Sequence, residues 1–229
     1  MKSNILTRRI ESIGEVSEHF DILVDSQIGI IKEVKEIDTE SGSPNFFHYA
    51  AEAANTKAFS TQENFANTGG ASTHREIAIA KAMGEAIERY SAAIYDIETL
   101  PLSSANDAPF KCAKPESFAL HSAAQYASPG FPWVPFNSDT PIRWTPAYDL
   151  IKDETVHVPA AFVWIPYRYF QGSGDSPIGQ PISTGLACHR TLARSALSGL
   201  CEVIERDAFT ITWQAKLSRP QIRIETLSD

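Results

Sequence analysis

Residues 83–89 read Met-Gly-Glu-Ala-Ile-Glu-Arg, and residues 200–206 read Leu-Cys-Glu-Val-Ile-Glu-Arg. Both segments share the pattern Glu-x-x-Glu-Arg, in which the two intervening residues are apolar or small. Side chains three and four positions apart lie on the same side of an α-helix, so each segment should bring two carboxylates and one guanidinium together. The pattern predicts two long helices, one ending near Ile94 and the other near Trp213.

The start of each predicted helix carries a capping signal. Thr73-His74-Arg75-Glu76 has the spacing of a capping box, and Thr191 is a suitable N-cap for the second helix. Apart from the charged stripe, both helices consist mostly of apolar or small residues, among them Ile77, Ile79, Ala80, Ala82, Met83, Ala193, Ala196, Leu197, Leu200 and Ile204. A helix that is apolar over most of its circumference is expected to be buried.

The charged stripes predict a site. Buried carboxylates are costly unless they are paired or bound to a metal, and Mg²⁺ prefers hard oxygen ligands together with nucleotide phosphates. Arginines can hold phosphate oxygens with two parallel hydrogen bonds. Two structural helices with plain i,i+4 ion pairs, in a general metabolic enzyme, would produce the same local pattern. The residues concerned are Glu85, Glu88, Arg89, Glu202, Glu205 and Arg206.

The remaining sequence predicts strands on both sides of the first helix. Short strand-like segments are expected at 21–24, 28–34, 45–50, 56–60, 144–150, 155–158, 161–167 and 221–225, with a glycine turn at 68–72. Residues 101–143 are expected to be irregular, with one short helix near 116–120. Strands interleaved with long helices predict a mixed α/β (α+β) fold with two long buried helices.

Bulk composition excludes several classes of protein. With 229 residues, 43% of them hydrophobic, the chain is long enough for one domain, predicted over 1–229. A net charge of −8 argues against nucleic acid or an anionic membrane as the main partner. The three cysteines are far apart, which argues against a disulfide framework or a zinc site. The N-terminus lacks a signal sequence, so a soluble, cytoplasmic protein is expected.

At these residues the sequence resembles the YcaO family. The resemblance rests on Ala-Met-Gly-Glu-Ala-Ile-Glu-Arg-Tyr-Ser-Ala at 82–92, Ser-Thr-Gly-Leu-Ala at 183–187, and Leu-Cys-Glu-Val-Ile-Glu-Arg-Asp-Ala-Phe at 200–209. Gly69-Gly70-Ala71-Ser72 stands where the family has a glycine-rich turn. The similarity covers about residues 20–225, which corresponds to the N-terminal half of a family domain.

The resemblance implies an activity and a set of ligands. Family members use ATP and Mg²⁺ to phosphorylate the oxygen of a peptide amide. In azoline-forming cyclodehydratases a Cys, Ser or Thr side chain then closes a thiazoline or oxazoline ring, as in bacteriocin biosynthesis. The implied metal ligands are Glu85, Glu88, Glu202 and Glu205, joined at the ATP by Arg89 and Arg206. The implied partners are a precursor peptide, a leader-binding protein and a second copy of the chain. No side chain is assigned as a catalytic acid or base.

Some positions depart from the family pattern. Lys81 stands where the family often has Ser, and Arg190 and Arg194 stand where it commonly has Asn and Glu. The resemblance also leads us to expect a chain truncated relative to a whole family domain. Two alternatives therefore stay beside the cyclodehydratase: a non-catalytic or incomplete YcaO chain that acts as a scaffold or needs a complementary half, and a thioamide-forming enzyme.

Overall fold

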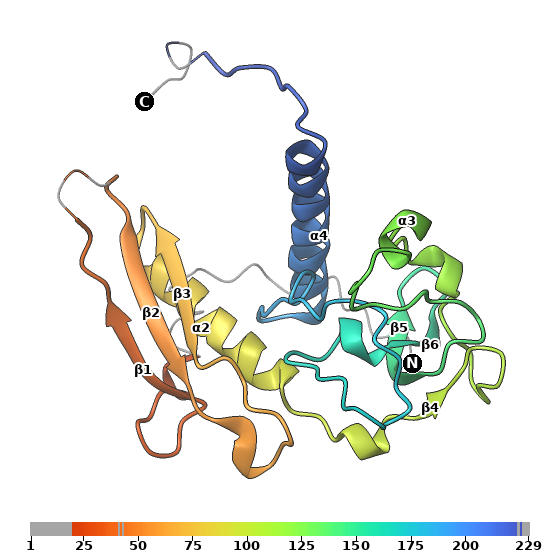
Figure 1. Ribbon diagram of the computed structural model, residues 1–229. Helices are drawn as coiled ribbons and strands as arrows, with labels where there is room; N and C mark the ends of the chain where they lie inside the picture. The colour runs from red at the N-terminus through yellow and green to blue at the C-terminus, as the bar shows by residue number, and fades with distance from the viewer. Residues whose placement is uncertain (1–19, 41, 43, 224, 226–229) are drawn as a thin grey trace. The chain divides into compact units, whose positions relative to one another are not determined.

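The computed structural model describes residues 20–40, 42, 44–223 and 225 (Figure 1). Two compact units divide the described chain, one within residues 7–183 and one beginning at Thr184. The first unit contains both β-sheets and the first long helix. The second unit contains the other long helix. The mixed α/β architecture predicted from the sequence is confirmed.

The first sheet is three-stranded and antiparallel, in the order β1-β2-β3. Its strands are β1 (Ile31–Glu36), β2 (Phe47–Ala53) and β3 (Asn67–Ser72), and helix α2 (Arg75–Ala92) covers one face (Figure 1). The core between sheet and helix consists of buried side chains, most of them small: Ile31, Tyr49, Ala51, Ala53, Ala78, Ala82, Met83 and Ala86. Small residues on both surfaces allow the helix to lie close to the strands.

The glycine-rich segment at 68–72 is a strand and not the predicted turn. A Cβ atom at Gly70 would stand 2.2 Å from the carbonyl oxygen of Ala78 and 2.6 Å from the nitrogen of Ala82. The glycine is therefore needed because α2 passes directly over the strand. Glycine at this position is explained by the contact with α2 and not by a turn.

Two further local predictions in this unit are wrong. Helix α2 begins after His74, which makes no side-chain capping bond, so the predicted capping box at 73–76 does not form. The segment 56–60 is not a strand. It contains the 3₁₀ turn η1 (Thr56–Ala58), because the side chain of Asn55 accepts a hydrogen bond from the N–H of Lys57.

The second sheet contains β4 (Leu102–Ser103), β5 (Ile142–Asp149) and β6 (Glu154–Pro159), all antiparallel. Trp144 is fully buried beneath it with Ile142 and Ile178. Between β4 and β5 the chain is largely irregular, as predicted, with the 3₁₀ turn η3 (Pro115–Ser117) and the short helix α3 (Ala123–Tyr126). The single-turn helices η2 (Ile97–Thr99) and η4 (Ala160–Phe162) flank this sheet in sequence.

The predicted strand at 161–167 is also absent. The chain leaves η4 as a loop, which brings Trp164 and Tyr167 onto the ring of Tyr95 at centroid distances of 5.4 and 6.0 Å. Aromatic packing holds this loop in place where ladder hydrogen bonds were expected.

Helix α4 (Leu192–Gln214) is the regular element of the second unit. Its N-cap is Thr191, whose hydroxyl accepts from the N–H of Arg194 at 3.3 Å, as predicted. Residues 221–223 are not a strand, contrary to the prediction. None of the helices in the described part of the chain is both long and apolar enough to cross a membrane.

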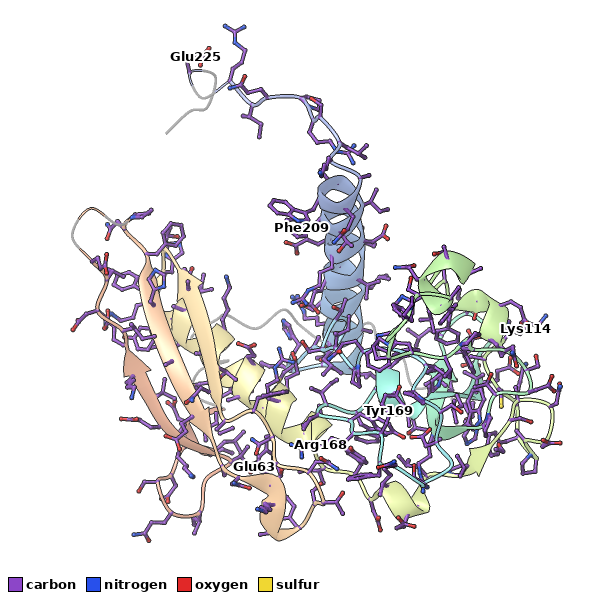
Figure 2. The ribbon with its side chains drawn as sticks, in the orientation of Figure 1. Glu63, Lys114, Arg168, Tyr169, Phe209 and Glu225 are labelled. Atoms are coloured by element: carbon purple, nitrogen blue, oxygen red, sulfur yellow. The ribbon has the colours of Figure 1, made fainter. Side chains whose placement is uncertain are left out.

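The predicted burial holds for α2 but is wrong for α4. Only Gly199 of α4 is buried. The large apolar side chains along α4 have exposed fractions from 44 to 71%: Leu192, Leu197, Leu200, Val203, Ile204, Phe209, Ile211 and Trp213. Figure 2 shows Phe209 projecting from the side of the helix. The difference arises because the second unit has no other regular element, within its described residues, to pack against α4.

Candidate functional site

The charged stripe of α2 is joined to the strand before it. Glu85 accepts a hydrogen bond from the backbone N–H of Gly69 through Oε2, at 3.1 Å, and receives Nη2 of Arg89 at Oε1, also at 3.1 Å. The other guanidinium nitrogen of Arg89 lies 3.7 Å from Oε1 of Glu88. Side chains of Glu88 and Arg89 are 16% exposed, whereas that of Glu85 is 37% exposed. The arginine thus bridges both glutamates, and Glu85 is the member that solvent reaches most easily.

The charged stripe of α4 repeats most of this arrangement. Glu202 accepts from the backbone N–H of Gly185 through Oε2, at 2.8 Å, and pairs with Nη2 of Arg206 through Oε1, at 2.8 Å. The second guanidinium nitrogen of Arg206 donates to Oγ1 of Thr184 at 3.2 Å. Glu205 is exposed and makes no hydrogen bond or ion pair with any residue that the structure describes.

The repeat seen in the sequence therefore extends to hydrogen bonds outside the two helices. Each stripe, with the segment before its helix, forms one half of the repeat. In each half the backbone N–H of a glycine 16 or 17 residues before the first glutamate donates to one oxygen of that carboxylate. Sequence reasoning missed both glycine contacts. A signal for them was present, because Thr68-Gly69 and Thr184-Gly185 are matching dipeptides ahead of the two helices.

Close packing brings these N–H groups within reach of the carboxylates. In the first half Gly70 allows β3 to touch α2. In the second half a Cβ at Gly199 would stand 2.3 Å from the carbonyl oxygen of Gly185, so the helix itself supplies the glycine. Gly185 also has a φ of +91°, which favours glycine over any residue with a side chain.

The donor sets of both halves suit Mg²⁺ and a nucleotide. A carboxylate has about four acceptor positions, so Glu85 and Glu202 keep lone pairs after their two contacts. Within the described residues, neither half gathers three or more His, Cys, Asp or Glu side chains into a metal site by itself. Mg²⁺ does not require such a cage, because it is commonly held by one or two carboxylates, waters and phosphate oxygens.

Three basic residues that depart from the family pattern lie near the two stripes in sequence. Lys81 is exposed, and its Nζ donates to the carbonyl oxygen of Ala71 at 3.0 Å. Arg194 is exposed and forms no ion pair with Glu202, whose partner is Arg206. The positive charge of Arg194 acts on His189 instead. Burial of the imidazole, with a smaller contribution from Arg194, lowers the pKa of His189. Consistent with a neutral ring, Nδ1 of His189 accepts from the N–H of Arg190 at 2.8 Å.

The model of one protein family, described as YcaO cyclodehydratase, ATP- and Mg²⁺-binding, matches residues 69–229. The chain therefore belongs to the YcaO family, and the resemblance drawn from the two Glu-x-x-Glu-Arg segments is confirmed.

Two curated relatives share part of the sequence. One, an uncharacterized protein encoded in the tfuA 3′ region of Rhizobium leguminosarum bv. trifolii, is 37% identical over 73 residues, which are 31% of this chain and 16% of the relative. The other, an uncharacterized protein of Methanothermobacter thermautotrophicus, is 33% identical over 145 residues, 62% of this chain and 33% of the relative.

Solved structures share the fold over nearly the whole chain. A heterocyclase in complex with substrate and cofactor superimposes with a TM-score of 0.74 at 22% identity, covering 98% of this chain and 31% of that one. YcaO from Methanopyrus kandleri, bound with AMPPCP and Mg²⁺, gives a TM-score of 0.63 at 18% identity, covering 97% of this chain and 50% of that one. The chain thus spans at most half the length of these relatives.

Proposed function

We propose that this protein binds ATP and Mg²⁺ through its two Glu-x-x-Glu-Arg segments and takes part in activating peptide amides for ring formation. The observation that carries the proposal is the repeated contact in which a glycine N–H and an arginine fix the two oxygens of Glu85 and of Glu202. A structural ion pair needs only the arginine. A carboxylate held from both sides is oriented in advance for a ligand, as phosphoryl transfer requires.

The six charged residues have distinct proposed roles. The four glutamates supply the hard oxygen ligands for Mg²⁺, and the arginines donate to phosphate oxygens. When bound, ATP supplies the γ-phosphoryl group, which the oxygen of a peptide amide accepts. The residues in these roles are Glu85, Glu88, Glu202 and Glu205 for the metal, and Arg89 and Arg206 for the nucleotide.

Membership of the YcaO family supports a peptide as the substrate. A Cys, Ser or Thr side chain of that peptide would add to the activated amide carbon, and the oxygen would leave with the phosphoryl group as inorganic phosphate. The proposed partners are a precursor peptide and a leader-binding protein, in the cytoplasm. Product mass separates this activity from its close alternative, because ring formation removes water whereas thioamide formation exchanges oxygen for sulfur.

Calorimetric titration of the 229-residue chain with ATP, with and without Mg²⁺, tests the proposal directly. We expect saturable binding that requires the metal and is lost with EDTA. Binding that is absent, or unchanged when Mg²⁺ is removed, would contradict it.

A second candidate function is favoured by the exposed apolar surface of α4. Leu200 and Ile204 are 57 and 61% exposed, one helical turn apart. Such a surface on a helix marks an interaction site. In this alternative the chain is a scaffold or one component of a YcaO assembly, and a second polypeptide covers α4.

Co-expression with the coding sequence that follows this one in its genome tests this alternative. Hydroxyl-radical labelling of Leu200 and Ile204 should decrease in the co-purified complex, and unchanged labelling would reject the alternative.

A further inference from the structure

The charged stripes of α2 and α4 differ in what holds the second end of the arginine. Arg89 reaches both glutamates of its helix, with Nη2 on Glu85 and Nη1 3.7 Å from Glu88. Among the described residues Arg206 forms an ion pair with Glu202 alone, and its Nη1 donates to Oγ1 of Thr184 at 3.2 Å. The hydroxyl of Thr184 thus takes the place that the second glutamate has in the first half.

This difference changes which group stands beside the second glutamate. Glu88 has an arginine beside it, and its side chain is 16% exposed. Glu205 is exposed and has no ion-pair partner among the described residues. Because Glu205 precedes Arg206 on the same helix as Glu88 precedes Arg89, the arginine could reach it in the same way if nothing held it elsewhere.

We propose that Thr184 is a positioning residue: its hydroxyl holds Arg206 away from Glu205 and so leaves that carboxylate free to bind a divalent cation. The inference rests on the proposed function, because it assigns the ability to take the metal unequally to two segments with the same sequence pattern. A guanidinium beside a carboxylate occupies some of its acceptor positions, so a carboxylate without one keeps more of them for a cation. Glu205 is therefore the glutamate most accessible to Mg²⁺, and Thr184 keeps it so.

The test is the Mg²⁺ concentration needed for half-maximal ATP binding by the full chain. Thr184→Val keeps the shape of the side chain but removes the hydroxyl. We expect it to raise that concentration about tenfold, the lower end of what outer contacts to metal ligands are worth. Thr184→Ser restores the hydroxyl and should return the value to that of the unmodified chain, which a loss of packing alone would not explain.

Thr212 provides a matched control on the same helix. Its Oγ1 accepts from two nitrogens of Arg219, at 3.1 and 2.8 Å, so Thr212→Val removes the same kind of contact about 15 Å along the helix from Glu202. This variant should leave the Mg²⁺ requirement unchanged. Circular dichroism of each variant checks that α4 still forms.

A double substitution tests the route through the arginine. In an Arg206→Met background, Thr184→Val should have no further effect on the Mg²⁺ requirement, because the residue it controls is gone. Equal Mg²⁺ requirements for the unmodified chain and Thr184→Val would overturn the inference while leaving the proposed function intact. An unmodified chain that does not bind Mg²⁺ and ATP would overturn the proposed function and, with it, the inference.

Discussion

The backbone N–H of Gly69 donates to Oε2 of Glu85 at 3.1 Å, so a residue of the ladder between β2 and β3 orients a side chain on the helix that follows it. Gly69 is paired with Ala50 of β2 in the same ladder, which fixes the position of the donor. The other oxygen of Glu85 is held by Arg89. The carboxylate is thereby oriented by the sheet and by its own helix together.

Replacing Glu85 or Glu202 by alanine should weaken Mg²⁺-dependent ATP binding by at least about tenfold, because each substitution removes an oriented metal ligand. Calorimetric titration of the variants measures this effect. Glu76→Ala is the matched control, since Glu76 is exposed and stands on α2 outside the charged stripe. Equal affinity for ATP in the two stripe variants and the control would show that Glu85 and Glu202 are not ligands of the metal.

Two glycines near Glu85 should respond in opposite ways to alanine. Gly70→Ala should lower the free energy of unfolding by about 1–3 kcal/mol, because its Cβ would overlap the backbone of α2. Gly84→Ala should raise it by about 0.5–1 kcal/mol, because nothing lies within 4 Å of the new Cβ and alanine favours a helix. Urea unfolding compares them, and a stable Gly70→Ala protein would contradict the close contact between β3 and α2.

The two arginines should differ in their contribution to stability despite their identical motif. Arg89 is 16% exposed and bridges two glutamates, so Arg89→Met should lower the free energy of unfolding by about 1–3 kcal/mol. Arg206 is 51% exposed, and Arg206→Met should change it by less than about 1 kcal/mol. Urea unfolding measures both variants. Equal decreases in the free energy of unfolding would show that exposure does not determine how much each arginine contributes to stability.

Asp175 makes the stability of the first unit depend on pH. Its carboxyl is buried, and burial raises its pKa above 3.8 despite hydrogen bonds from the hydroxyl of Tyr167 at 2.5 Å and the N–H of Arg143 at 3.0 Å. A raised folded-state pKa means that the folded protein binds this proton more tightly than the unfolded chain does. The stabilisation is complete below the unfolded pKa and is lost as pH rises through the folded pKa.

Asp175→Asn cannot ionise, so it isolates this effect. The free energy of unfolding of the unmodified chain, minus that of the variant, should decrease as pH rises from about 4 towards neutrality. Urea unfolding at a series of pH values measures the difference. A constant or increasing difference would show that the hydrogen bonds outweigh burial at this carboxyl.

Local signals predicted the parts of the fold that depend on neighbouring residues. Thr191 caps α4 as expected, because an N-cap needs only its own side chain and the N–H groups that follow. The side-by-side placement of Glu85, Glu88 and Arg89 likewise follows from helix geometry alone. The clustering of charged side chains on one face of a helix could therefore be predicted from the sequence.

Features that depend on distant residues could not be predicted in this way. Gly69 and Gly70 form a strand because α2 passes over them, and a composition typical of turns does not reveal that contact. The burial expected for α4 is wrong for a similar reason, since an apolar sequence predicts the need for a partner and not its presence. The hydrogen bond from Arg206 to Thr184 joins residues 22 positions apart, beyond any helical spacing.

The apolar exposure of α4 also affects how the stability of this chain should be measured. Trp213 and Leu192 are 71 and 70% exposed, at opposite ends of a 23-residue helix. Any molecule that binds only the folded form of this helix, including another copy of the chain, shifts the unfolding equilibrium by mass action. Self-association through α4 would make the melting temperature rise with protein concentration, so the temperature should be measured at several stated concentrations.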